Sequence, residues 1–109
     1  MAFRVEVTAR AKRDLNAILE WLLSQQAGDT GLRWFHGLRD AIESLSETPR
    51  RCMLAPESEA FPFEVRQLLY GRRPHTYRIL FIVEQDIVTV LHIRRGRRLP
   101  LAGSERVRL

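Results

Sequence analysis

Residues 77–94 read YRILFIVEQDIVTVLHIR, and this stretch decides the fold. Two runs rich in β-branched and aromatic residues, 77–84 and 87–94, flank the polar pair Gln85 and Asp86. This pattern predicts a β-hairpin with a two-residue turn. Both runs are apolar on both faces, which is typical of strands at the centre of a sheet whose two faces are covered.

The length of the turn predicts the register of the hairpin. If the turn has two residues, positions whose numbers sum to 171 face each other across it. His92 is then expected opposite Ile79 and Tyr77 opposite Arg94, with Arg78 on the other face. A β-bulge or a longer turn would flip one strand and bring Arg78 and His92 to the same face.

The segments around the hairpin complete an α+β pattern. Residues 3–7 alternate as in a half-buried strand, and Thr8 is placed to cap a helix with an apolar stripe from 11 to 23. A second helix is expected to begin with Asp29 or Thr30 as its cap and to end before Pro49. Residues 50–63 are predicted to form a loop, and 64–70 a further strand turned by residues 71–74. The predicted fold is a strand, a two-helix hairpin and a three-stranded antiparallel meander that completes a small sheet.

The length of 109 residues fits a single domain over 1–109. Gly96, Pro100 and Gly103 predict a flexible basic tail over 96–109. The single cysteine, Cys52, and the absence of a long apolar run predict a cytoplasmic protein that does not enter a membrane. The cysteine and the histidines are scattered and no phosphate-binding loop is present, so we expect no metal site and no cofactor.

Charge is distributed unevenly along the chain. Residues 1–64 carry 8 basic and 10 acidic side chains, a net charge of −2, whereas residues 65–109 carry 10 arginines and 3 acidic side chains, a net charge of +7. Such polarity favours an anionic partner, either a nucleic acid or an acidic protein segment. The planar guanidinium of arginine suits phosphate and carboxylate groups alike.

The candidate binding residues are arginines and two tyrosines of the predicted sheet and its exit. They are suited to bind phosphate, with the tyrosines stacking on bases, or to stabilise the charge of a phosphodiester transition state. Alternatively, the tyrosines pack at the sheet edge and the arginines only solvate it. The set comprises Arg66, Tyr70, Arg72, Arg73, Tyr77, Arg78, Arg94, Arg95, Arg97 and Arg98.

Several stretches resemble toxins of the RelE/ParE superfamily, the toxic halves of type II toxin–antitoxin modules, also known as plasmid stabilisation proteins. Residues 5–22, VEVTARAKRDLNAILEWL, resemble the first strand and helix of that family. RWFHGLRDAIESLSETPRR at 33–51 resembles its second helix. VRQLLYG at 65–71, YRILFIVEQDIVTVLHI at 77–93 and RRGRR at 94–98 resemble its closing strands and basic exit. The resemblance implies a growth-inhibiting toxin that is neutralised by a cognate antitoxin.

The superfamily has two mechanisms, and the residues bear on the choice. RelE-like members cut messenger RNA on the ribosome without a metal, whereas ParE-like members poison DNA gyrase. By resemblance, Arg78 matches a family arginine of the third strand, and Arg97 or Arg98 the arginine after the last strand. The RelE-like lysines are missing, since only Arg66 is basic at that place, and no tyrosine or histidine follows His92.

Arginine cannot serve as a general base because its pKa exceeds about 12. The sequence therefore favours a ParE-like toxin that is not an enzyme. A ribonuclease using Arg66, Arg78, His92 and Arg97 is the alternative, and an inactive module member that only binds antitoxin and operator DNA is a third reading. The expected partners are an antitoxin with an acidic, amphipathic C-terminal segment, in a toxin–antitoxin hetero-oligomer, and either gyrase or the ribosome with its mRNA. The antitoxin is expected on an uncovered apolar groove beside the central strands.

Overall fold

Two long strands form the centre of the sheet in the computed structural model, which describes residues 2–96. They are β3 (Tyr77–Glu84) and β4 (Ile87–Arg95). Glu84 lies opposite Ile87, so the predicted two-residue turn is confirmed. Gln85 has a positive φ of 55°, as the first position of a primed hairpin turn requires.

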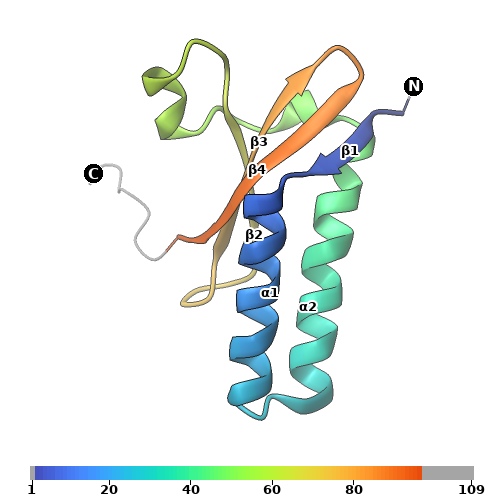
Figure 1. Cartoon of the computed structure of the whole chain (residues 1–109), viewed down its shortest axis with the longest axis vertical. Coiled ribbons are helices and arrows are strands. Elements are labelled where there is room, and N and C mark those ends of the chain that lie inside the picture. Colours follow the sequence, from blue (N-terminus) through green and yellow to red (C-terminus); the bar gives the residue numbers. More distant parts are fainter. Residues whose placement is uncertain (1, 97–109) are drawn as a thin grey trace.

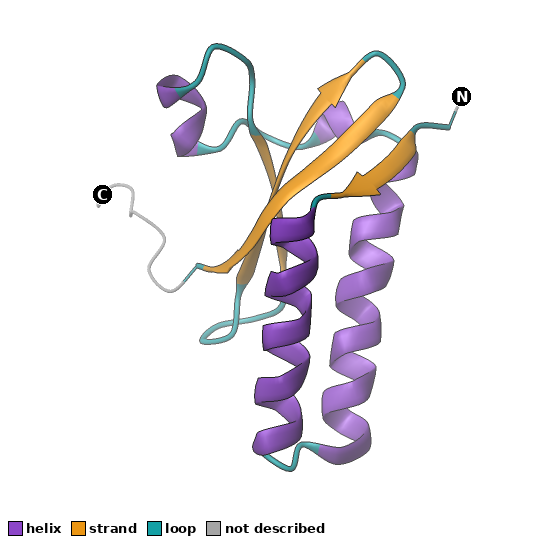
Figure 2. Cartoon of the chain, viewed as in Figure 1, coloured by secondary structure: helices purple, strands orange, loops and turns teal. Residues whose placement is uncertain are grey.

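The remaining strands flank this hairpin in the order β1-β4-β3-β2 (Figures 1 and 2). β2 (Arg66–Tyr70) pairs antiparallel with β3, as predicted for the meander. β1 (Arg4–Val7) pairs parallel with β4, which makes the sheet mixed. The predicted α+β class and the central position of the two apolar strands are confirmed.

A helical hairpin covers one face of the sheet. α1 (Ala9–Ser24) begins where predicted, because the Thr8 hydroxyl accepts a hydrogen bond from the Ala11 amide at 3.1 Å. α2 (Gly28–Glu43) begins earlier than predicted, and the expected cap at Asp29 or Thr30 is wrong. Positive φ values at Gln26 and Gly28, 53° and 64°, turn the chain within a few residues and bring 29 and 30 inside the first turn.

The main core lies between the helices and the sheet. Its fully buried members come from both layers and include Leu38 and Leu45 on the helical side and Ile79, Phe81, Val88 and Val90 in the central strands. Alternate residues of β3 and β4 face this core, so their neighbours point to the opposite side of the sheet, here called the outer face.

The outer face is covered by the segment that the sequence predicted as a loop. This segment contains two short 3-10 helices, η2 (Pro49–Arg51) and η3 (Pro56–Ala60), each with a proline in its first turn, and a third, η1 (Ser44–Ser46), precedes them. Ala55 and Val65 pack with Leu80 in a second, smaller core. The segment predicted as a loop therefore meets the second face of the sheet.

The predicted register fails in the second half of the hairpin, where β4 carries a bulge. Positions sum to 171 as far as Phe81, which lies opposite Val90, but His92 then lies opposite Leu80. In the shifted register Tyr77 lies opposite Arg95 and Arg78 opposite Arg94, so the predicted pairs of His92 with Ile79 and of Tyr77 with Arg94 are wrong.

The bulge coincides with a change of partner along the free edge of β4. β1 pairs with β4 only as far as Val90. Beyond that point the start of α1 takes over, because the Thr8 amide donates to the Val90 carbonyl at 3.1 Å and the Thr8 hydroxyl to the Leu91 carbonyl at 3.2 Å. Inserting one extra residue therefore lets β4 pass from a strand neighbour to a helix neighbour.

The predicted flexible tail lies outside the described residues except for Gly96, whose amide donates to the Thr76 carbonyl at 2.8 Å. Within residues 2–96, neither helix has the length and apolarity that crossing a membrane demands.

Candidate functional site

Each of the three guanidinium nitrogens of Arg78 is hydrogen-bonded to a neighbouring side chain on the outer face. Its two terminal nitrogens donate to the two carboxylate oxygens of Glu57 at 3.0 and 2.5 Å, and its Nε donates to Gln67 Oε1 at 2.9 Å. The side chain of Arg78 is only 13% exposed. Arg78 therefore fastens η3 to the sheet.

Glu57 is held in its charged form by this arrangement. Burial by itself raises the pKa of Glu57, but the hydrogen bonds from Arg78 and from its own backbone, together with the charges of Arg78 and Arg94, lower it further than burial raises it. The carboxylate is thus ionised at neutral pH, and a charged pair joins η3 to β3.

Arg66 also has a structural role. One of its terminal nitrogens donates to the Cys52 carbonyl at 2.6 Å, and the other pairs with Glu64 at 3.1 Å. Its side chain is 18% exposed. Arg66 thus ties the start of β2 to the segment that runs beside it.

The two tyrosines lie on the helical face, away from the arginines of the outer face. Tyr77 is 9% exposed, and its ring meets that of Trp34 edge-on at 5.4 Å. The Tyr70 hydroxyl donates to the Trp34 carbonyl at 2.7 Å, and burial followed by the charge of Asp40 raises the pKa of Tyr70. The prediction that Tyr77 stacks on bases is wrong because its ring is in the core. The Tyr70 ring meets Trp34 edge-on, with centroids 5.1 Å apart.

The exposed arginines lie at two places. Arg94 is exposed on the outer face, where it neighbours Arg78 across the β3–β4 ladder. Arg72, Arg73 and Arg95 are exposed at the end of the sheet formed by the turn before β3, and Arg95 reaches the Pro74 carbonyl at 3.3 Å. The structure therefore divides the predicted arginine set, of which Arg97 and Arg98 lie outside the described residues.

His92 is oriented by Asp14, a residue of α1 that no motif in the sequence marks as functional. His92 Nδ1 lies 2.5 Å from Asp14 Oδ2, which also accepts the Ile93 amide at 2.9 Å. Arg10 Nη2 lies 3.3 Å from His92 Nε2, so the network assigns the ring proton to Nδ1. Burial raises the pKa of Asp14, but the hydrogen bonds from Ile93, His92 and Arg10 together hold it below its usual range.

The three described nuclease candidates are thus not assembled into one site. Arg66 is held by the segment beside β2, Arg78 by η3 and His92 by α1. In the shifted register, Arg78 and His92 fall on the same side of the β3–β4 ladder. Each is nevertheless bound by a different carboxylate, Arg78 by Glu57 and His92 by Asp14. The fourth candidate, Arg97, lies outside the described residues. Within residues 2–96, no three His, Cys, Asp or Glu side chains gather as metal ligands do.

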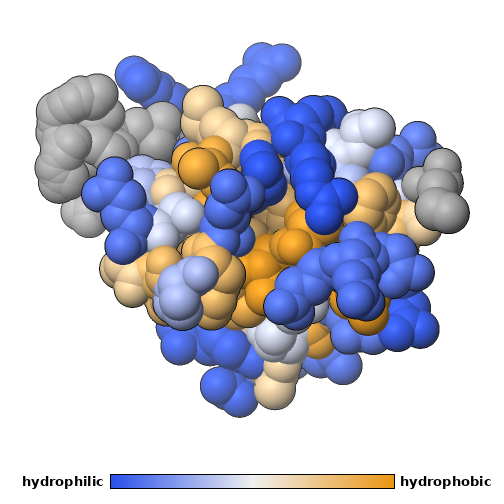
Figure 3. Space-filling view, turned by 90° about the horizontal axis from the view of Figure 1, so that it is seen from above, coloured by the Kyte–Doolittle hydropathy of each residue, from blue (hydrophilic) through white to orange (hydrophobic). Residues whose placement is uncertain are grey.

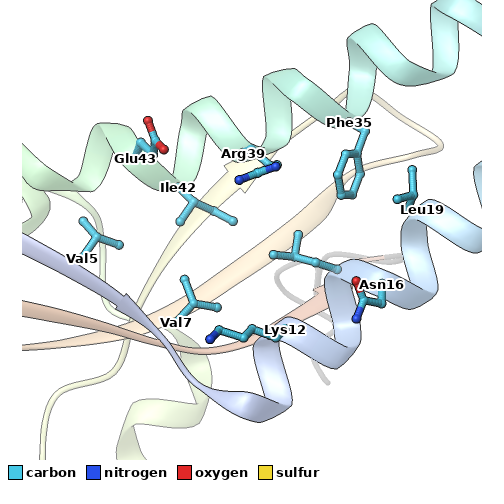
Figure 4. A pocket seen from close by; sticks show the side chains of 10 residues that line it. Val5, Val7, Lys12, Asn16, Leu19, Phe35, Arg39, Ile42 and Glu43 are labelled. Atoms are coloured by element: carbon cyan, nitrogen blue, oxygen red, sulfur yellow. The ribbon is translucent and has the colours of Figure 1, made fainter.

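A groove of about 460 Å³ opens between α1, α2 and β1 (Figure 4). Its floor is apolar, and its rim carries Lys12 and Asn16 from α1 and Arg39 and Glu43 from α2. The sequence signal for it was the pair of amphipathic helices, but the groove itself depends on how both helices pack against β1. The apolar side chains of the floor are Val5, Val7, Leu15, Leu19, Phe35 and Ile42.

A second apolar surface lies at the end of the molecule that carries η3 and the β3–β4 turn (Figure 3). Viewed from the end that carries η3 and the β3–β4 turn, apolar residues gather in the middle of the molecule and hydrophilic ones surround them (Figure 3). Phe61 and Phe63, which follow η3, are 49% and 44% exposed, and their rings stack with centroids 5.4 Å apart.

Both the sequence and the structure of the chain are similar to those of known toxins. The sequence profile described as "ParE toxin of type II toxin-antitoxin system, parDE" matches residues 5–100. No curated protein sequence gives a significant match. A chain of the chromosomal ParDE toxin–antitoxin system from P. aeruginosa is similar in structure, with a TM-score of 0.69 and 21% identity over 86% of this chain and 96% of that one.

A mutant of the E. coli toxin RelE in the free state also shares the fold, with a TM-score of 0.58 and 18% identity over 88% of this chain and 85% of that one. Both likenesses concern the fold, whereas the sequence profile covers nearly the whole chain. The chain belongs to the ParE toxin family of type II toxin–antitoxin systems.

Proposed function

We propose that this toxin is ParE-like in mechanism and inhibits growth by acting on DNA gyrase, without cutting RNA. The observation that carries the proposal is the engagement of Arg78 by Glu57 and Gln67. The charge of Arg78 is paired with the Glu57 carboxylate and each of its three nitrogens donates to a protein acceptor, so the side chain is not placed to stabilise the charge of a phosphodiester transition state. The likeness to a chain of a ParDE system supports the same reading.

A ribonuclease is the second candidate, and the Asp14–His92 pair is the observation that favours it. A carboxylate that orients an imidazole is a common general-base arrangement. In this chain, however, His92 Nε2 faces Arg10, and Arg78 is paired with Glu57. If His92 served as a base, replacing it would abolish activity, whereas the ParE-like reading predicts that His92→Ala remains toxic.

Induced expression in a bacterial host separates the candidates. The gyrase reading predicts filamentation and DNA-damage signalling, and purified toxin is expected to inhibit supercoiling by gyrase in vitro. Rapid translation arrest with cleaved transcripts, lost in a folded His92→Ala variant, would establish the ribonuclease instead. Absence of any growth effect would support an inactive module member that acts only in antitoxin binding and repression.

The groove between α1, α2 and β1 suits the antitoxin. Its apolar floor accepts the apolar face of an amphipathic helix, and Lys12 and Arg39 on the rim are placed to meet acidic side chains. We infer that a disordered C-terminal segment of the antitoxin folds into this groove on binding. The sequence predicted an antitoxin groove beside the central strands, whereas this groove lies between the two helices and the edge strand β1.

A pair of charge-introducing variants on one helix tests the groove. Leu19 lines it, whereas Leu23 lies farther along α1 and is 60% exposed. Leu19→Glu is expected to weaken antitoxin binding at least tenfold in calorimetry with the product of the neighbouring gene, because a charge enters the apolar floor and repels an acidic helix. Leu23→Glu is expected to bind within about twofold of the parent. Equal affinities for the two variants would place the antitoxin elsewhere.

A further inference from the structure

Three exposed arginines gather at the end of the sheet where the chain turns from β2 into β3. Arg72 and Arg73 lie in the turn itself, and Arg95 ends β4 beside it. Within residues 2–96, none of the three forms a salt bridge. In contrast to Arg66 and Arg78, these arginines thus carry charges that no carboxylate of the described chain offsets.

The turn that carries Arg72 and Arg73 is held in one conformation. The His75 amide donates to the Arg72 carbonyl at 2.6 Å. Gly71 has a positive φ of 94°, and a Cβ at this position would clash with the His75 carbonyl oxygen. A partner therefore meets arginines whose backbone is already ordered, which reduces the conformational entropy lost on binding.

An exposed tryptophan of α1 lies beside this turn (Figure 1). Trp21 is 42% exposed, and its ring centroid lies 6.2 Å from that of His75. His75 Nδ1 in turn lies 3.2 Å from Arg95 Nη2, so helix, turn and strand end form one continuous surface. Tryptophan and arginine are the side chains that most often dominate the binding energy of protein–protein contacts, and arginine, unlike lysine, is enriched there.

We propose that Trp21, Arg72, Arg73, His75 and Arg95, here called the basic turn surface, bind an acidic surface of the protein that the toxin inhibits. The inference rests on the proposed function, because a toxin that acts by binding a protein needs a surface of this kind. Carboxylates of the partner pair with the arginines, and apolar atoms of the partner cover the exposed ring of Trp21.

The basic turn surface is separate from the groove proposed for the antitoxin. None of its five residues lines that groove, to which α1 contributes Lys12, Leu15, Asn16 and Leu19. Binding of the antitoxin therefore reports whether a variant is folded without depending on the basic turn surface.

Reversing one charge in the turn tests the role of the arginines. Arg73→Glu is compared with Arg13→Glu, because Arg13 is exposed on α1 and the change in net charge is the same. Binding to immobilised gyrase subunits, free of DNA, is measured by surface plasmon resonance. At about 50 mM salt, Arg73→Glu is expected to associate at least about tenfold more slowly than Arg13→Glu, and the difference is expected to shrink at about 500 mM.

Truncating the tryptophan tests the apolar part of the same surface. Trp21→Ala is compared with Leu23→Ala, since Leu23 lies on the same helix and is 60% exposed. Trp21→Ala is expected to dissociate from gyrase at least about tenfold faster than the parent, and Leu23→Ala within about twofold of it. All four variants are expected to bind the antitoxin as the parent does.

Three results would overturn the inference. The first is equal binding of Arg73→Glu and Arg13→Glu to gyrase. The second is an equal loss of antitoxin binding in Arg73→Glu, since the surface would then belong to the antitoxin. The third is a loss of binding to a short fluorescent duplex DNA in Arg73→Glu with unchanged binding to gyrase, because the partner would then be a nucleic acid.

Failure of the unaltered toxin to bind gyrase would overturn the proposed function instead. Growth inhibition on induced expression then decides about the basic turn surface. Loss of toxicity in Arg73→Glu and Trp21→Ala, but not in Arg13→Glu and Leu23→Ala, would support the surface with a different protein as target. Full toxicity of all four variants would refute it.

Discussion

Removing the Asp14 carboxylate is expected to weaken the junction between α1 and the bulged half of β4. Asp14→Ala removes the acceptor of the Ile93 amide, which lies in a residue only 3% exposed. Leaving a buried amide without a partner costs about 1–3 kcal/mol. The pair with His92 is partly exposed and adds about 1 kcal/mol, and the exposed contact with Arg10 adds a few tenths.

The expected loss is therefore about 2–4 kcal/mol out of a total stability of about 5–15 kcal/mol for a domain of this size. Urea unfolding followed by the fluorescence of the two tryptophans measures it. With a slope of about 2 kcal/mol/M, the midpoint of Asp14→Ala is expected to fall by about 1–2 M. Glu20→Ala, an exposed carboxylate on the same helix, is the control and is expected to change stability by less than about 0.5 kcal/mol.

The stability that Asp14 contributes is expected to decrease as the pH falls. Since the folded state lowers the pKa of Asp14, its contribution is fully present above the unfolded value near 4 and is lost as the pH falls through the folded value. The gap in stability between the parent and Asp14→Ala is thus expected to be largest near pH 7 and to shrink below about pH 4. The reasoning would be refuted if Asp14→Ala lost no more stability than Glu20→Ala does, or if its loss of stability were the same at every pH.

Three further substitutions test the packing by the same unfolding assay. Gly37→Ala places a methyl group on the Tyr70 hydroxyl and is expected to destabilise by about 1–3 kcal/mol, although alanine normally favours a helix; a stabilised variant would contradict this contact. Thr8→Ala removes the cap of α1 and is expected to cost about 1–2 kcal/mol, whereas Thr8→Ser, which keeps the hydroxyl, is expected to cost less. Phe81→Ala empties a fully buried site and is expected to cost about 3–5 kcal/mol, so a loss below 1 kcal/mol would argue against its place in the core.

The sequence by itself determined the elements and the family of this protein. Period-two and helical patterns reflect which faces of each segment are buried, and these are local properties that a single segment displays. The two-residue turn, the Thr8 cap and the central position of the apolar hairpin followed from such patterns. The order of these elements carried the resemblance to toxins that the family match bears out.

Only the tertiary structure decided the register beyond Val90 and the partners of the charged side chains. The bulge arises where β4 leaves β1 and meets α1, a contact between segments about 80 residues apart that leaves no local pattern. For the same reason the sequence indicated Arg78, His92 and Tyr77 as candidate binding or catalytic residues but did not indicate their partners. The structure shows that these partners are Glu57, Asp14 and Trp34, respectively. Whether an arginine is free or bound depends on which distant carboxylate the fold brings within hydrogen-bonding reach, because side-chain pairing is set by packing and not by the neighbouring sequence.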